Sequence, residues 1–354
     1  MKARILLDDG TIFEGESFGA QKTVCGEIVF NTGMTGYQEI LTDPSYGGQV
    51  VVMTYPLIGN YGINDDDIES NSIKAEGFVV KEYSEIASNW KSTKNISEYL
   101  KENNIFGITG IDTRMLTKKI RTQGTMNCLI TTENIENIHK EALKKYVFPS
   151  DIVKMVSRKE IEVIKGKNGR IALIDLGVKY GIVNQLAALD CEVHLYPCNI
   201  NAETILNSGF DAVLLSNGPG DPKDVTEVIE TAKKLIGKIP LLGICLGHQI
   251  LALALGGDTY KLKFGHRGSN HPVIDLRSNK VMITAQNHGY AVNKESMPKN
   301  TLITHINVND ETTEGFCVPD LNIYTVQFHP EAGPGPKDAN VIFSEWINLV
   351  KTNT

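Results

Sequence analysis

The chain carries the pentapeptide Gly243-Ile244-Cys245-Leu246-Gly247, which places one thiol between two glycines. The apolar run from Ile239 to Ile244 leads into it, and a helix-like stretch follows. A sharp strand-to-helix turn of this kind, a nucleophile elbow, needs glycines where a Cβ would clash, and it directs the helix N-terminus at the central side chain. A buried cysteine packed as a small hydrophobic residue fits this segment equally well. The segment therefore predicts a strand, a turn and a helix, and the role of Cys245 depends on other segments.

Around this pentapeptide, short apolar strands alternate with helical stretches from Arg170 onward. The strand-like runs are mostly apolar and lie at 171–174, 192–196, 212–215 and 240–244. Such runs are typical of strands buried on both faces, and their alternation with helices predicts a parallel sheet flanked by helices. Ligands bind beyond the carboxyl ends of the strands in these sheets, and Cys245 stands at such an end.

Two further strand ends carry residues suited to chemistry. The run at 212–215 leads into Ser216-Asn217-Gly218-Pro219-Gly220-Asp221-Pro222, a loop that can present backbone N–H groups but lacks the Lys-Ser/Thr ending of a phosphate-binding loop. A strand pattern from 323 delivers His329 and Glu331, which point to the same side of an extended chain because they are two residues apart. A carboxylate beside an imidazole fixes its tautomer, so these two residues and Cys245 fit a Cys-His-acid triad.

The first part of the chain has a different pattern. Alternating apolar residues flank Asp9-Gly10, a pair typical of tight hairpins, and further strand-like runs lie at 27–30, 49–54 and 77–80. Helix character appears at 97–103, with Ser97 as its cap, and at 112–121, with Asp112 as its cap. We expect an α/β protein with an N-terminal mixed α/β domain over residues 1–150, a charged linker over 151–169, and a second α/β domain with a mainly parallel central sheet over 170–354.

Composition excludes several classes of protein. The chain has 354 residues, a formal net charge of -7 and no Lys/Arg-rich run, which argues against a nucleic-acid partner. No apolar run approaches membrane-spanning length and the start does not resemble a signal peptide, so we expect a cytoplasmic protein without membrane segments. The six cysteines form no Cys-x-x-Cys pair and are expected to be free thiols. The histidines His266 and His271 lie close in sequence but lack metal-ligand spacing, so no metal site is expected.

Three ordered motifs resemble those of the class I (triad) glutamine amidotransferases: Ser216 to Pro222, Gly243-Ile244-Cys245-Leu246-Gly247-His248-Gln249, and His329-Pro330-Glu331. The first domain is similar to that of the small, glutamine-hydrolysing subunits of carbamoyl phosphate synthetases. The residues that carry this second resemblance are Phe30 to Glu39, Thr42 to Tyr46, Pro56 to Gly62 and Gly110 to Arg114, together with Gly265 to Pro272 and Gln286 to Val292 in the second domain.

This resemblance implies a mechanism. Cys245 would attack the side-chain amide carbon of glutamine, His329 would protonate the departing ammonia, and Glu331 would orient His329. The backbone N–H groups of Leu246 and Gly220 would bind the oxyanion. The family's glutamine contacts map onto Ser45, Gly218, Gly220, Leu246, Gln249, Asn287, Gly289 and Tyr290.

The resemblance also implies a partner. A large synthetase subunit would bind ATP and magnesium, receive the ammonia through a tunnel, and make carbamoyl phosphate for pyrimidine and arginine synthesis. No cofactor is expected in this chain itself, and the first domain would supply much of the interface with the large subunit.

Three alternatives remain at this point. The chain could be a class I amidotransferase subunit for another acceptor, as in guanylate or anthranilate formation, although this leaves the first domain without a purpose. It could be a stand-alone γ-glutamyl hydrolase, which would need no partner for full turnover. It could also be a scaffold with a decayed glutaminase site, which the presence of Cys245, His329 and Glu331 disfavours.

Overall fold

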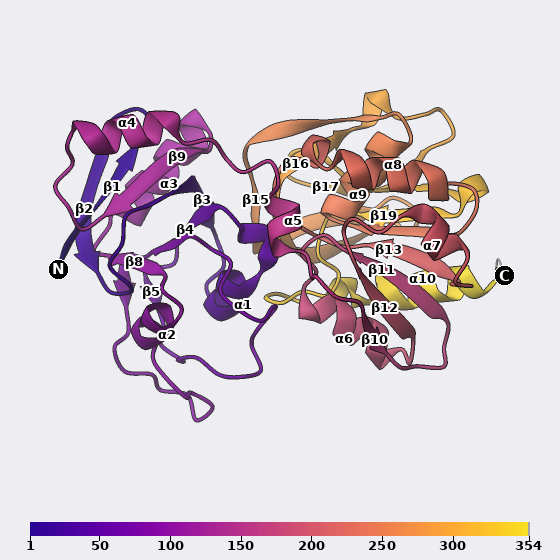
Figure 1. Ribbon diagram of the computed structural model, residues 1–354, viewed down its shortest axis with the longest axis horizontal. Coiled ribbons are helices and arrows are strands. Elements are labelled where there is room, and N and C mark those ends of the chain that lie inside the picture. The colour runs from indigo at the N-terminus through magenta and orange to yellow at the C-terminus, as the bar shows by residue number, and fades with distance from the viewer. Residues whose placement is uncertain (353–354) are drawn as a thin grey trace. The chain divides into compact units, whose positions relative to one another are not determined.

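The structure is a computed structural model that describes residues 1–352 (Figure 1). It divides the chain between Pro149 and Ser150 into two compact units, each treated by itself below. Within residues 1–352, every helix is too short or too polar to span a bilayer.

The N-terminal unit is built on a closed barrel of seven strands. In order around the barrel they are β1 (Lys2–Leu7), β2 (Ile12–Ser17), β8 (Phe106–Thr109), β6 (Gly77–Val79), β4 (Gln49–Met53), β3 (Val24–Asn31) and β9 (Met126–Thr131). Strands β1 and β2 form the predicted hairpin, and Gly10 takes the positive φ of 84° that its turn requires. A separate two-stranded sheet pairs β5 (Leu57–Ile58) with β7 (Glu82–Tyr83).

Four helices complete this unit: α1 (Tyr37–Thr42), α2 (Ile96–Glu102), α3 (Thr113–Gln123) and α4 (Asn137–Lys145). The predicted cap of α3 is confirmed, because the Asp112 side chain accepts a hydrogen bond from the Met115 N–H. The predicted cap of α2 is wrong. Asn95 caps this helix, since Asn95 and Glu98 exchange side-chain and backbone hydrogen bonds in a capping box. Asn95 and Ser97 are both suitable N-cap residues, but only Asn95 has a glutamate three residues later, Glu98, with which to form the capping box.

The C-terminal unit contains a ten-stranded sheet. Its central strands are parallel and in the order β12 (Glu192–Pro197), β11 (Arg170–Asp175), β13 (Ala212–Leu215), β14 (Leu241–Ile244) and β19 (Ile323–Val326). Antiparallel strands continue the sheet beyond β19: β18 (Thr313–Val318), β16 (Lys280–Asn293), β15 (Asp258–Asp275) and β17 (Leu302–Asn307). The mixed α/β class and the parallel centre of the sheet agree with the expectation.

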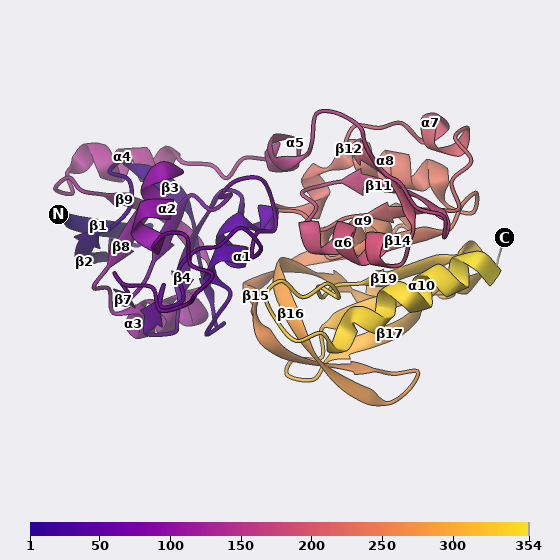
Figure 2. The same cartoon turned by 90° about the horizontal axis from the view of Figure 1, so that it is seen from below.

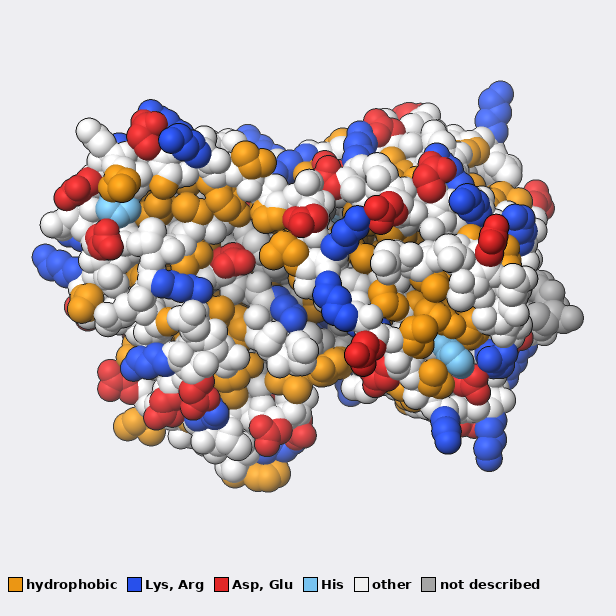
Figure 3. Space-filling view, viewed as in Figure 1, with side chains coloured by type: hydrophobic (Ala, Val, Ile, Leu, Met, Phe, Trp, Pro, Cys, Tyr) orange, Lys and Arg blue, Asp and Glu red, His pale blue; other side chains and the backbone are white. Residues whose placement is uncertain are grey.

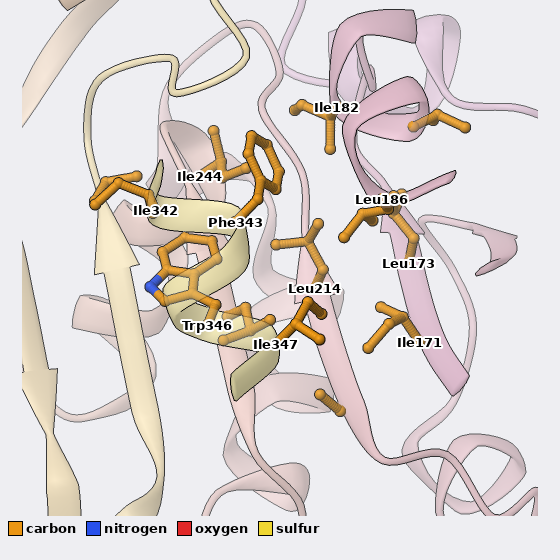
Figure 4. Close-up of a cluster of buried hydrophobic side chains, with 14 of the residues drawn as sticks. Ile171, Leu173, Ile182, Leu186, Leu214, Ile244, Ile342, Phe343, Trp346 and Ile347 are labelled. Atoms are coloured by element: carbon orange, nitrogen blue, oxygen red, sulfur yellow. The ribbon is translucent and has the colours of Figure 1, made fainter. Parts of the chain in front are cut away.

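Helices cover both faces of this sheet, as Figures 1 and 2 show. One face carries α6 (Tyr180–Ala188) and α10 (Val341–Thr352), and the other carries α7 (Ala202–Leu206), α8 (Thr226–Leu235) and α9 (Leu246–Ala254). In Figure 4, Phe343 and Trp346 of α10 pack in the same buried cluster as Leu214 of β13 and the side chains of α6. Each fully buried side chain of this size contributes roughly 1.5–3 kcal/mol, so this core fixes the strand ends on which the site is built.

The predicted linker over 151–169 is wrong. This segment belongs to the C-terminal unit and contains α5 (Ile152–Val156) and β10 (Glu162–Ile164), which pairs antiparallel with β12 at the edge of the sheet. A three-residue, mostly exposed edge strand has too short a pattern to be recognised before its pairing partner is known.

Charges of both signs are interspersed over the face drawn in Figure 3, without a broad surface of one sign. This distribution offers no basic stripe of the kind that nucleic-acid backbones require on the face in view.

Candidate active site

Cys245 stands at the elbow that the sequence predicts. Strand β14 ends at Ile244 and helix α9 begins at Leu246, while Cys245 between them has a φ of 54°. A positive φ costs a non-glycine residue on the order of 1–3 kcal/mol and is found most often at functional sites. A Cβ on Gly247 would lie 2.1 Å from the Leu215 carbonyl oxygen, and one on Gly243 would lie 2.8 Å from the backbone of Gly247. Both glycines are therefore required by close backbone approach.

The loop after β13 lies directly against this elbow. The Gly247 N–H donates to the Ser216 carbonyl at 3.0 Å, which ties the loop to the start of α9. A Cβ on Gly218 would lie 2.8 Å from Leu246 Cδ2, and Gly220 has a φ of 90°. The Leu246 N–H is the first of helix α9 and has no acceptor within the helix. The loop and the helix start thus form a shaped backbone surface beside Cys245, as oxyanion binding requires.

His329 and Glu331 are paired in the same unit. The backbone N–H of His329 donates to the Ala285 carbonyl at 2.9 Å, which fixes the segment after β19 against β16. His329 Nδ1 and Glu331 Oε1 lie 2.7 Å apart, and both side chains are buried. Because Nδ1 is committed to the carboxylate, Nε2 is the ring nitrogen left for proton transfer.

The surroundings of His329 keep its ring protonated. Burial alone would lower the pKa of His329, but the charge of Glu331 and its hydrogen bond to the ring outweigh burial and raise the pKa to about 10. The buried Nε2 of the ring makes no hydrogen bond within the described residues. The ring therefore holds a proton that it can give to a leaving group.

Lys179 is a member of this site that the sequence reasoning missed. Its Nζ donates to Glu331 Oε1 at 2.9 Å and to the Ala332 carbonyl at 2.5 Å, and its side chain is only 2% exposed. Burial would raise the pKa of Glu331, but Lys179 and His329 lower it to about 2. The carboxylate is thus held charged against His329. The available signal was a lysine between apolar Val178 and the apolar residues of α6, just beyond the carboxyl end of β11.

Most of the predicted glutamine contacts lie around the nucleophile. Cys245 Sγ is 3.7 Å from the Asn287 carbonyl oxygen of β16. The Gln249 amide donates at 2.9 Å to the Tyr290 carbonyl and at 2.9 Å to the Gln327 side chain. The predicted residues Asn287, Gly289 and Tyr290 all belong to strand β16, which is therefore held close to the elbow by Gln249. Gln249 acts in this structure as a brace for that strand.

Ser45 belongs to the other unit. It lies in the 3-10 turn Pro44–Tyr46, where its N–H donates to Asp43 Oδ1 at 2.9 Å and the residue is buried. Its contribution to glutamine binding stays a prediction.

A second buried polar cluster joins strands β15, β16 and β18. The ligand atoms of His266, His288 and Glu314 are within 4.8 Å of one another, which is the one grouping of the described residues with a metal-ligating composition. His266 Nε2 is 2.8 Å from Asp310 Oδ2, and the Gln286 amide donates to Glu314 at 2.9 Å. Burial would lower the pKa of His266, but Asp310 and Glu314 raise it to about 9. A protonated imidazole between two carboxylates accounts for this cluster without an ion.

His266 should therefore make stability depend on pH. Because folding raises its pKa from 6.5 to about 9, the fold favours the protonated ring, and this contribution is complete below pH 6.5 and lost as the pH rises through 9. We expect His266→Gln to lower the free energy of unfolding more at pH 6 than at pH 9.5. Urea unfolding of both proteins at the two pH values measures this, and an equal loss at both would contradict a charged His266.

Comparison with known proteins gives two family matches. Residues 5–130 match the family described as "Carbamoyl-phosphate synthase small chain, CPSase domain", and residues 172–349 match "Glutamine amidotransferase class-I". A solved structure of a glutamine amidotransferase from Thermotoga maritima is 20% identical, with a TM-score of 0.38, and covers 53% of this chain and 86% of that chain.

Curated relatives are similar over nearly the whole length. The "Carbamoyl phosphate synthase small chain" of Bacillus caldolyticus is 53% identical over 353 residues, covering 99% of this chain and 97% of the relative. The "Carbamoyl phosphate synthase pyrimidine-specific small chain" of Bacillus subtilis is 52% identical, with the same two coverages. The small chain of Clostridium acetobutylicum is 51% identical and covers 99% and 100%.

Proposed function

Because the chain belongs to the family of carbamoyl phosphate synthase small chains and is the glutaminase subunit of that enzyme, we propose that Cys245, His329 and Glu331 are its catalytic residues. The observation that carries this assignment is the pairing at 2.7 Å of His329 Nδ1 with Glu331, which leaves the buried Nε2 of the ring without a hydrogen-bond partner among the described residues and available for proton transfer.

The proposed reaction proceeds through a thioester. With the proton held by His329, Cys245 Sγ attacks the side-chain amide carbon of glutamine as the thiolate, the C–N bond breaks, and His329 Nε2 gives its proton to the departing ammonia. Water then attacks the γ-glutamyl thioester while His329 takes its proton, and glutamate leaves as the thiolate and the protonated imidazole are restored. The backbone N–H groups of Leu246 and Gly220 would bind the oxyanion in both steps, and losing one such donor typically costs about 10²–10³ in rate.

Glu331 and Lys179 do not contact the substrate in this mechanism but position His329. Glu331 orients the His329 ring and stabilises its protonated form. Lys179 contacts Glu331 and not the reacting atoms, so it is a positioning residue. Substrate recognition is assigned to Ser45, Gly218, Gly220, Leu246, Gln249, Asn287, Gly289 and Tyr290 on the resemblance given above.

The ammonia needs a protected destination. Ammonia released into neutral water is protonated and ceases to be a nucleophile, so hydrolysis is useful only when it passes directly to a second site. The proposed partner is a large synthase chain that binds ATP and Mg²⁺ and makes carbamoyl phosphate from bicarbonate for pyrimidine and arginine synthesis. No cofactor is assigned to the small chain, and the free thiols support a cytoplasmic location.

The alternatives are not favoured. A subunit for another acceptor or a stand-alone hydrolase would use the residues that match the amidotransferase family, but neither accounts for residues 5–130, which match the carbamoyl-phosphate synthase family.

Reconstitution tests the proposed partnership. The chain, a large chain from the synthase of a relative, Mg²⁺-ATP, bicarbonate and glutamine are expected to produce carbamoyl phosphate, whereas the large chain alone should need added ammonia. Full glutamine turnover by this chain alone, with no stimulation by the large chain, would instead identify a stand-alone hydrolase.

A covalent label tests the nucleophile directly. A glutamine analogue with a chloromethyl ketone in place of the amide should alkylate Cys245 alone among the six cysteines, because only this thiol is held in a glutamine site. Peptide mass analysis locates the label, and excess glutamine should suppress it. Labelling of Cys25 or Cys317 at the same rate would contradict the assignment.

A further inference from the structure

The loop of residues 84–93 in the N-terminal unit exposes two large apolar side chains. Trp90 is 88% exposed and Ile86 is 82% exposed. These are the two highest exposed fractions of any large apolar side chain among the described residues. Leaving two such side chains in water forgoes about 1.5–3 kcal/mol of burial energy each. We name this segment the tip loop, and its exposed pair is a candidate contact surface.

The tip loop is nonetheless firmly held. The Ser84 N–H donates to the Ile58 carbonyl at 2.8 Å, the Ser88 N–H to the Asn60 carbonyl at 2.9 Å, and the Thr93 N–H to the Ile63 carbonyl at 2.8 Å. A Cβ on Gly62, which has a φ of 75°, would lie 2.8 Å from the Ala87 Cβ, so the backbone beneath the loop packs closely against it. A surface shaped in advance loses little conformational entropy when a partner binds.

Charged side chains surround the exposed pair. Lys91 Nζ lies 2.7 Å from Asp66 Oδ2 and 5.6 Å from the centre of the Trp90 ring, which restrains that ring. The negative charge of Asp67 also attracts Lys91. Glu85, the residue before Ile86, is exposed. With three carboxylates against one lysine, the rim of the tip loop is acidic.

We propose that the tip loop docks into the large synthase chain, with Trp90 and Ile86 entering an apolar pocket whose rim is basic. An aromatic anchor with an apolar neighbour inside a polar rim is the usual anatomy of an interface hot spot. The N-terminal unit matches the family of this synthase and carries none of the catalytic triad, and the acidic rim selects a basic counterpart. This inference rests on the proposed function, which supplies the large chain.

Binding measurements with variants test the docking. Trp90→Ala and Ile86→Ser are expected to weaken the affinity for the large chain by about 30-fold or more, the loss typical of a hot-spot residue. The matched control is Ile138→Ser, because Ile138 in α4 of the same unit is 71% exposed and outside the tip loop. It should change the affinity less than threefold. Glutamine hydrolysis by each free variant should equal that of the wild-type chain, and thermal unfolding checks that all three fold.

Tryptophan fluorescence gives a second readout on the intact chain. The chain has two tryptophans, and Trp346 is 5% exposed, so acrylamide quenching reports mainly on Trp90. Adding the large chain should shift emission to shorter wavelength and protect Trp90 from quenching. If the wild-type chain binds the large chain and Trp90→Ala binds equally well, this inference alone fails. If the wild-type chain binds no large chain, the proposed function fails as well. Concentration-dependent burial of Trp90 in the chain alone would overturn the choice of partner in favour of a second copy.

Discussion

Cys245→Ser is expected to lower the rate of glutamine hydrolysis by about 10⁴-fold or more, as removal of a triad nucleophile does in other hydrolases. Serine keeps the shape of the side chain in a site where Cys245 is only 2% exposed, so the elbow should persist. A neutral hydroxyl is a much poorer nucleophile than a thiolate paired with a protonated imidazole. Glutamate release in the complex with the large chain measures the loss.

Two controls separate chemistry from folding in this experiment. Carbamoyl phosphate synthesis from added ammonia should remain at the wild-type level, because the large chain performs that reaction without the thiol. Cys25→Ser changes a partly exposed cysteine of the other unit and should leave glutamine hydrolysis unchanged. Glutamine-dependent synthesis that survives Cys245→Ser would remove Cys245 from the mechanism.

Lys179→Met is expected to reduce both activity and stability. The substitution leaves the Glu331 carboxylate buried without its lysine, and breaking a buried ion pair on one side typically costs about 3–5 kcal/mol. The orientation of His329 depends on Glu331, so we expect kcat for glutamine hydrolysis to fall roughly 10²-fold while KM changes less. Urea unfolding and steady-state kinetics measure the two effects.

A double variant distinguishes positioning from bulk stability. Lys179→Met combined with Glu331→Gln removes both buried charges, so part of the lost stability should return. Activity should not return with it, because glutamine cannot stabilise a protonated His329. Recovery of activity together with stability would mean that Lys179 serves only to keep the unit folded.

The elements that hold the proposed catalytic residues could be predicted from the pattern of residues close together in the sequence. The alternation of apolar strands with helices after Arg170, and the glycines on each side of Cys245, predict the parallel sheet and the elbow because both depend on neighbouring residues. The same holds for the hairpin at Asp9-Gly10 and the cap at Asp112. The edge strand β10 was missed, since three residues have no readable period until β12 pairs with them.

The sequence by itself determined the type of sheet and the elbow, and it pointed to Cys245, His329 and Glu331 as the set of residues proposed for catalysis. Only the tertiary structure decided that Lys179 enters the site, that Gln249 braces strand β16, and that Trp90 is left in water. The physical reason is that strand and turn patterns are set by residues a few positions apart. The partner of a buried charge can lie far away in the sequence: Lys179 and Glu331 are 152 positions apart. Such a pair can be identified only from the tertiary structure, in which the ends of the strands lie side by side.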